Sequence, residues 1–196
     1  MSTGTLTKVT AKTAVEICKL FPLGDEAKKL LRDGLTPPQY LDVLIEKQQY
    51  VDAVRFLAHA LPKREAVWWA CLSVRAGLGT TLPAPQATAL QAAERWVADP
   101  SETNRRAAET TAEAAGVGTP GGCTAMAAFW SGGSLAPPKA PVVPPGETLT
   151  AHGVVGAVLL AAVATEPQKA PDKHRKCLAQ GIEVGNGTNR WKEPGR

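Results

Sequence analysis

The sequence predicts an all-α fold, either an irregular multi-helix bundle or a short α-solenoid-like array, with one proline-rich extended segment. Apolar residues recur at helical spacing between proline and glycine boundaries. Isoleucine occurs only at Ile17, Ile45 and Ile182, and tyrosine is scarce, whereas strands favour β-branched and aromatic residues. With 44% hydrophobic and 20% charged residues, the 196-residue chain has the composition of a globular domain. We therefore expect more than half of the residues in helices and essentially no sheet.

Helix boundaries follow from caps, prolines and glycines. Asp25 places a negative charge in the first turn of one helix. Thr36 and Gln39 have the spacing of a capping box, and Asp99 precedes Pro100 as the cap of a later helix. The first two predicted helices lie at 10–21 and 25–33, and the next two lie on either side of a break near 48, one beginning at 36 and the other ending at 61. A fifth lies at 62–76, and the following two meet at the Asp99 cap, one beginning at 85 and the other ending at 115. The last three lie at 123–130, 148–165 and 170–184.

The helix at 62–76 is predicted to be the central one. The run from Ala66 to Leu72 is apolar at seven consecutive positions, so no side of this helix is left for water. Both Trp68 and Trp69 are then expected in the core, where truncation to alanine costs about 3–5 kcal/mol. The alternative is that one of the two rings lines a groove, because tryptophan is enriched at binding hot spots.

Residues 134–147 contain five prolines and no apolar period, which predicts an extended, non-helical segment. Val142 and Val143 are apolar residues that such a segment can bury. We expect a strap that wraps over the helices, with a free linker as the alternative. The chain then divides into a helical body at 1–133, the strap at 134–147, and a C-terminal helical hairpin with a loop tail at 148–196, all within a single domain.

The helix at 148–165 is rich in small residues, among them Gly153 and Gly156. Because the last helix contributes Gly181, we expect the two to pack as a tight hairpin. The apolar stretch 149–164 is shorter than the roughly 20 residues of a spanning helix. It is predicted to be a buried helix, without membrane insertion.

The cysteines are far apart and form no Cys-x-x-Cys pair, and the N-terminus lacks the apolar core of a signal peptide. A reduced, cytoplasmic protein is the simplest interpretation. His174 and Cys177 have no matching second pair, so no metal site is expected. The pattern Gly116-x-Gly118-x-x-Gly121 lacks the preceding strand of a dinucleotide motif, and no cofactor is expected.

A formal net charge of +4, with basic residues scattered among acidic ones, does not require an anionic partner. The densest basic run, at 173–176, lies near Asp172 and is interpreted as a solvated helix start. A nucleic-acid-binding protein is expected to contain several such basic clusters, with exposed aromatic residues between them. No nucleic-acid partner is therefore predicted, and no pattern sets the oligomeric state.

Five side chains around the predicted fourth and fifth helices are the candidate partner-binding residues: Arg55, His59, Lys63, Arg64 and Glu65. Arg55 and His59 are one helical turn apart, and Asp52 can pair with Arg55. The polar side of the fourth helix is predicted to carry Asp52, Arg55, Phe56 and His59, and its apolar face to carry Val51. Three interpretations stay open, namely a solvated polar cluster, a partner-binding surface, and an enzyme with His59 as general base. No residue is assigned as catalytic.

The segment YVDAVRFLAHALPKREAVWWACLSVR, residues 50–75, resembles an uncharacterised family of small helical bacterial proteins. The resemblance implies a helical accessory protein, in some cases in the setting of a bacterial secretion or injection system, and transfers no catalytic role. We expect a non-enzymatic adaptor or scaffold that binds another protein. The alternative is a small enzyme of unknown reaction with a polar site around Arg55, His59 and Glu65.

Overall fold

The computed structural model describes residues 3–188 and Trp191, and within them the fold is entirely helical. Two short 3₁₀-helices, Gly79–Thr81 and Pro167–Lys169, accompany the α-helices. The predicted all-α class is confirmed. The α-helices are α1 (Ala14–Cys18), α2 (Asp25–Leu30), α3 (Pro37–Glu46), α4 (Tyr50–Ala60), α5 (Lys63–Leu78), α6 (Ala84–Ala98), α7 (Glu102–Ala115), α8 (Pro120–Phe129), α9 (Leu149–Val163) and α10 (Ala170–Gly185).

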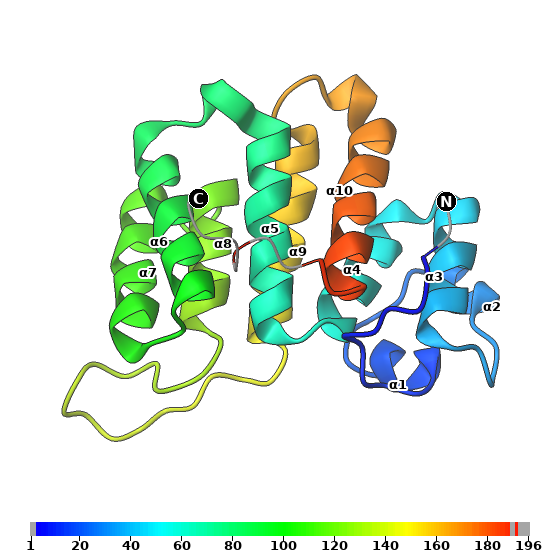
Figure 1. Ribbon diagram of the computed structural model, residues 1–196, viewed down its shortest axis with the longest axis horizontal. Helices are drawn as coiled ribbons and strands as arrows, with labels where there is room; N and C mark the ends of the chain where they lie inside the picture. The colour runs from blue at the N-terminus through cyan, green and yellow to red at the C-terminus, as the bar shows by residue number, and fades with distance from the viewer. Residues whose placement is uncertain (1–2, 189–190, 192–196) are drawn as a thin grey trace.

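Helices α5 and α9 lie side by side in the middle of the molecule (Figure 1). Helices α6, α7 and α8 form one flank. The other flank consists of α4 and α10, with α1, α2 and α3 beyond them. Because α5 contacts α6, α8, α9 and α10, its neighbours cover it on most sides, as its apolar run predicts.

The two adjacent tryptophans of α5 have different surroundings. Trp69 is fully buried, and its indole Nε1 donates a hydrogen bond of 2.7 Å to the carbonyl oxygen of Cys177. Gly181 admits this ring, because a Cβ there would lie 2.6 Å from Trp69 Cε2. Trp68 is only partly buried and packs edge-on against Trp191, with ring centroids 5.7 Å apart. The prediction of full burial is therefore correct for Trp69 and wrong for Trp68, because adjacent helical residues point about 100° apart.

The glycines of α9 serve a different contact from the predicted one. A Cβ at Gly153 would lie 2.8 Å from Ala127 Cβ, and one at Gly156 would lie 3.1 Å from Cys123 Sγ, both on α8. Gly181 of α10 faces α5 instead. The prediction that these small residues join α9 to α10 is wrong, because each glycine face meets whichever helix approaches it, and chain order does not decide which.

Helix α4 is buried over a wider arc than its predicted face. Phe56, predicted on the polar side, is fully buried, whereas Val51, predicted on the apolar side, is 41% exposed. Helix α4 lies between α1 and α3 on one side and α9 and α10 on the other. With neighbours on both sides, the helix leaves only a narrow exposed edge, which contains Val51 and Arg55.

The two capping predictions have different outcomes. The Thr36 N–H donates to Gln39 Oε1 at 2.9 Å, and the predicted capping box at α3 is present. At α7 the cap is Ser101, whose Oγ accepts from the Asn104 N–H. The prediction of Asp99 is wrong because α7 begins at Glu102, two residues later than its proline suggested.

The proline-rich segment 134–147 forms a loop that extends beyond the helices before it returns to α9 (Figure 1). Val142 and Val143 are 75% and 50% exposed. The expectation that the segment buries these valines is wrong, because the loop runs outside the bundle. Among the described residues, no single helix is long and apolar enough to cross a membrane.

Candidate functional site

The five candidate side chains at the corner between α4 and α5 separate into two groups. Arg55 and His59 are on α4, where Arg55 pairs with Asp52 of the same helix and His59 stacks on Phe21, which follows α1. Lys63, Arg64 and Glu65 are in the first turn of α5 and contact other parts of the chain. The structure therefore does not bring the five together as one surface, although His59 and Lys63 line the same small cavity.

Arg64 holds the end of α6. Its Nε donates to the carbonyl oxygen of Val97 at 2.6 Å, and one terminal nitrogen donates to that of Ala98 at 2.9 Å. The last carbonyls of a helix lack partners within it and carry partial negative charge, so a guanidinium there is stabilising. The same group lies 5.5 Å from the ring centroid of Trp191. These contacts give Arg64 a structural role.

Lys63 and Glu65 also have partners within the chain. Lys63 Nζ donates to the carbonyl oxygen of Ser131 at 2.9 Å. Glu65 lies 3.8 Å from Lys8 Nζ and is largely buried. Glu65, which the enzyme interpretation places in a polar site with Arg55 and His59, is therefore engaged with the N-terminal segment.

His59 lies between two aromatic rings. The Phe21 ring stacks on it at a centroid distance of 4.7 Å, and His152 meets it edge-on at 5.4 Å. Its Nδ1 is 2.8 Å from the carbonyl oxygen of Arg55. Because a carbonyl only accepts, Nδ1 carries the proton, and Nε2 presents a lone pair. Burial lowers the pKa of this imidazole below its usual 6.5, so the ring is neutral at neutral pH.

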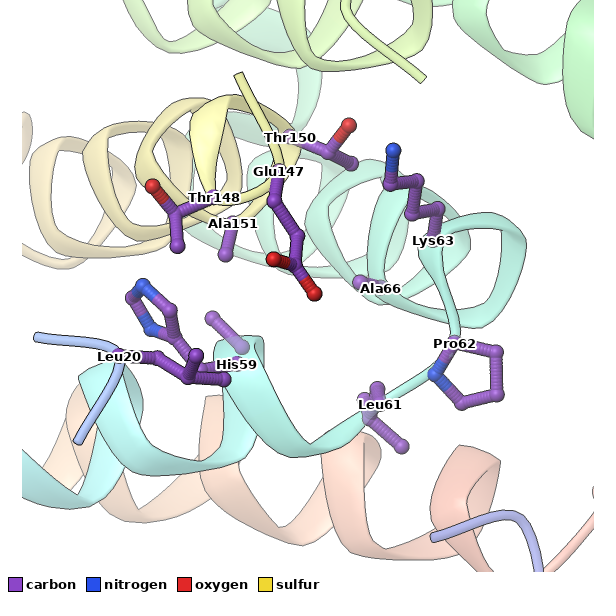
Figure 2. Close-up of a pocket in the computed structure, with 11 residues that line it drawn as sticks. Leu20, His59, Leu61, Pro62, Lys63, Ala66, Glu147, Thr148, Thr150 and Ala151 are labelled. Carbon is purple, nitrogen blue, oxygen red and sulfur yellow. The ribbon is translucent and has the colours of Figure 1, made fainter. Parts of the chain in front are cut away.

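A cavity of about 170 Å³ lies between this corner and the start of α9. Figure 2 shows the Glu147 carboxylate directed into it, with the His59 ring on one side and Lys63 turned away. Ligand pockets are usually larger, roughly 300–1,000 Å³. The cavity therefore suits a few water molecules or a small polar group. It is lined by Leu20, Ala58, His59, Leu61, Pro62, Lys63, Ala66, Glu147, Thr148, Thr150 and Ala151.

Asp52 links the corner to α2. This carboxylate is nearly buried, accepts a 3.1 Å hydrogen bond from the Gly24 N–H, and lies 3.5 Å from Arg55, the pairing that the sequence predicts. A Cβ at Gly24 would lie 2.8 Å from Asp52 Oδ2. The close approach places Arg55 beside the loop that leads into α2.

An apolar groove between α1 and α2, absent from the sequence prediction, adjoins this corner. It has a volume of about 380 Å³ and shares Phe21 with the surroundings of His59. Burial, with the nearby Asp52 charge, raises the pKa of the Cys18 thiol to about 12, so this side chain stays uncharged at neutral pH. The lining residues are Val15, Cys18, Lys19, Phe21, Pro22, Leu23, Lys28 and Leu31.

These features define an all-α protein in which a small polar corner adjoins an open apolar groove. Within the described ranges, no three His, Cys, Asp or Glu side chains lie together as metal ligands would. The chain belongs to DUF6931, a family of unknown function, whose model matches residues 40–185. The expected membership of an uncharacterised family is confirmed, and the α1–α2 groove precedes the matched residues. No curated protein and no solved structure matches the chain.

Proposed function

We propose that this protein is a non-enzymatic helical adaptor, and that the α1–α2 groove receives an acidic amphipathic segment of another protein. The observation that carries the proposal is the groove itself. Its wall consists mainly of apolar side chains, and exposed Lys19 and Lys28 stand on it. An amphipathic helix that binds such a groove buries its apolar face and keeps its charges at the rim.

Charge selects the partner. Among the described residues, Lys19 and Lys28 form no ion pair, unlike Lys29, which pairs with Glu26 at 2.6 Å. Arg55 is partly exposed close by, but Asp52 pairs with it at 3.5 Å, so the two lysines carry the charge at the rim. Positive groups at a rim favour a negatively charged partner through faster association and selectivity.

The candidate residues enter this proposal unequally. His59 supports the groove from behind, because its ring stacks on Phe21. Arg55 lies near the edge and is paired with Asp52, whereas Lys63, Arg64 and Glu65 hold α5 in place. The bacterial secretion or injection setting belongs to the same proposal and rests on the family resemblance. A cytoplasmic location is also part of the proposal and rests on the scattered, unpaired cysteines.

Site-specific photo-cross-linking tests the proposal. A photoreactive residue at Lys28 in the full chain, in the native cell, is expected to capture a protein through a segment rich in acidic and apolar residues. The control position is Glu113, which is exposed on α7 on the opposite flank. Capture through a basic segment, or equal capture from both positions, would refute the groove as the site.

A charge-reversal pair then measures the contribution of the rim. With the captured partner purified, Lys19→Glu with Lys28→Glu is expected to weaken binding about tenfold, with reduced salt dependence. Lys47→Glu with Lys176→Glu makes the same change in net charge at exposed positions outside the groove, and it should bind normally. An unchanged Kd in the groove variant would overturn the assignment.

A further inference from the structure

The loop at 134–146 has a defined tip. The Ala140 N–H donates to the carbonyl oxygen of Pro137 at 3.1 Å, which closes a four-residue turn. Lys139, third in that turn, has a φ of +73°, the conformation that a type II turn requires at this position. Pro138 precedes it, where proline is common in such turns. The chain therefore reverses at the tip and returns towards α9.

The returning arm of the loop, residues 141–146, has the sequence Pro-Val-Val-Pro-Pro-Gly and no regular secondary structure. Proline fixes φ near −65°, and a residue before proline is restricted to extended conformations. Both restrictions favour a polyproline II helix, which has three residues per turn. Pro141 and Pro144 then lie on one ridge, and Val142 lies beside it.

The main chain of the returning arm is hydrogen-bonded to the other side of the loop. The Val143 N–H donates to Ser134 Oγ at 3.0 Å, and its carbonyl oxygen accepts from the Leu135 N–H at 2.8 Å. Arg106 holds the base, because one of its terminal nitrogens donates to the carbonyl oxygens of Ser134 and Ala136, each at 2.7 Å. The loop is thus anchored at its base.

Three side chains of the returning arm, Pro141, Val142 and Pro144, are exposed to solvent. The exposed fraction of Val142 is 75%. Apolar side chains in an anchored, extended backbone lose little conformational entropy when a partner covers them. This combination distinguishes the loop from a solvated linker, in which glycine and serine give flexibility.

We propose that this ridge, Pro141, Val142 and Pro144, is a recognition peptide that an aromatic-lined groove of a partner protein binds in the polyproline II conformation. Such grooves bind preformed Pro-x-x-Pro segments by packing aromatic rings between the proline ridges. The loop carries that spacing at Pro141 and Pro144. The proposed role of this ridge is independent of the α1–α2 groove. The groove receives a segment of a partner, whereas the ridge is itself a segment that a partner binds.

The test uses the full chain with a photoreactive residue at Val142, in the native cell. The matched control is Val117, a second exposed valine, located after α7. We expect capture from Val142 alone, with cross-linked partner peptides that contain tryptophan or tyrosine. No capture above the control, or capture through peptides without aromatic residues, would overturn the proposal.

Two double variants then locate the ridge with the purified partner. Pro141→Ala with Pro144→Ala is expected to weaken binding about tenfold, with the melting temperature unchanged because both residues are exposed. Pro137→Ala with Pro138→Ala removes as many prolines from the same loop but leaves the ridge, and should retain binding. Unchanged binding by the first variant, or equal loss in both, would contradict the ridge as the recognised element.

Discussion

Helix α5 and the loop at 134–147 are both rich in apolar residues, yet one is enclosed and the other lies at the surface. In α5 the helical hydrogen bonds satisfy the main chain, so the element can enter the core. In the loop, five prolines remove donors and prevent regular pairing, so much of the main chain depends on water. Apolar side chains are therefore buried only where their backbone can be buried with them.

Truncation of one apolar side chain in each region should give the largest difference in the free energy of unfolding. Trp69→Ala removes a fully buried ring and leaves the Cys177 carbonyl oxygen without its donor. We expect a loss of about 3–5 kcal/mol in the free energy of unfolding. Val142→Ala should change it by less than about 0.5 kcal/mol. Urea denaturation followed by circular dichroism measures both.

Trp68→Ala sharpens this contrast within one helix. Its ring is only partly buried, so its truncation should cost clearly less than that of Trp69. Equal losses for the two variants would contradict the difference in burial that the structure assigns to them.

An added methyl group should distinguish the two regions next. At Gly77 in α5 a Cβ would lie 2.5 Å from the carbonyl oxygen of Ala161 on α9, which is main chain and cannot rotate away. Gly77→Ala is expected to cost about 1–3 kcal/mol through overpacking. At Gly132, before the loop, a Cβ meets nothing within 4 Å. Gly132→Ala should therefore be close to neutral in the same denaturation assay.

Acid should destabilise the helical body through two imidazoles, those of His59 on α4 and His174 on α10. Burial lowers the pKa of His59 and of His174 below the usual 6.5. As the pH falls through 6.5, the unfolded chain takes up protons that the folded chain resists, so the unfolded state binds more protons. The stabilisation is complete above that pH and is lost as the pH falls towards the folded pKa values.

The measurement is the melting temperature at about pH 7.5 and about pH 5.5. The double variant His59→Gln with His174→Gln should show a smaller drop between these conditions than the unmodified chain. An equal drop in both proteins would assign the acid sensitivity to other groups.

The smallest expected effect is at the tip of the loop. Lys139 adopts a positive φ, which costs a residue with a side chain about 1–2 kcal/mol, whereas glycine pays roughly 0.5–1 kcal/mol in unfolded-state entropy. Lys139→Gly should therefore stabilise the protein by about 0.5 kcal/mol. Ala140→Gly, at a neighbouring position without positive φ, should not stabilise it. Thermal melts compare the two variants.

Features that depend on neighbours along the chain were predictable from the amino-acid sequence. The Thr36–Gln39 capping box predicted the start of α3, and the apolar run of α5 predicted its central place. Local rules were insufficient where two signals competed, as at α7, where Ser101 caps the helix two residues after Asp99. Caps and periodicity act over one or two helical turns, so a single sequence reveals them.

The contacts between distant side chains became known only from the packing of the helices. Glu65, one of the predicted site residues, pairs with Lys8, whereas Glu147, just before α9, is directed into the cavity beside His59. The α1–α2 groove likewise forms from segments whose separate patterns show no cavity. Contacts between distant residues depend on how whole helices pack. That packing is set by the combined shapes of many side chains, and no local sequence pattern records them.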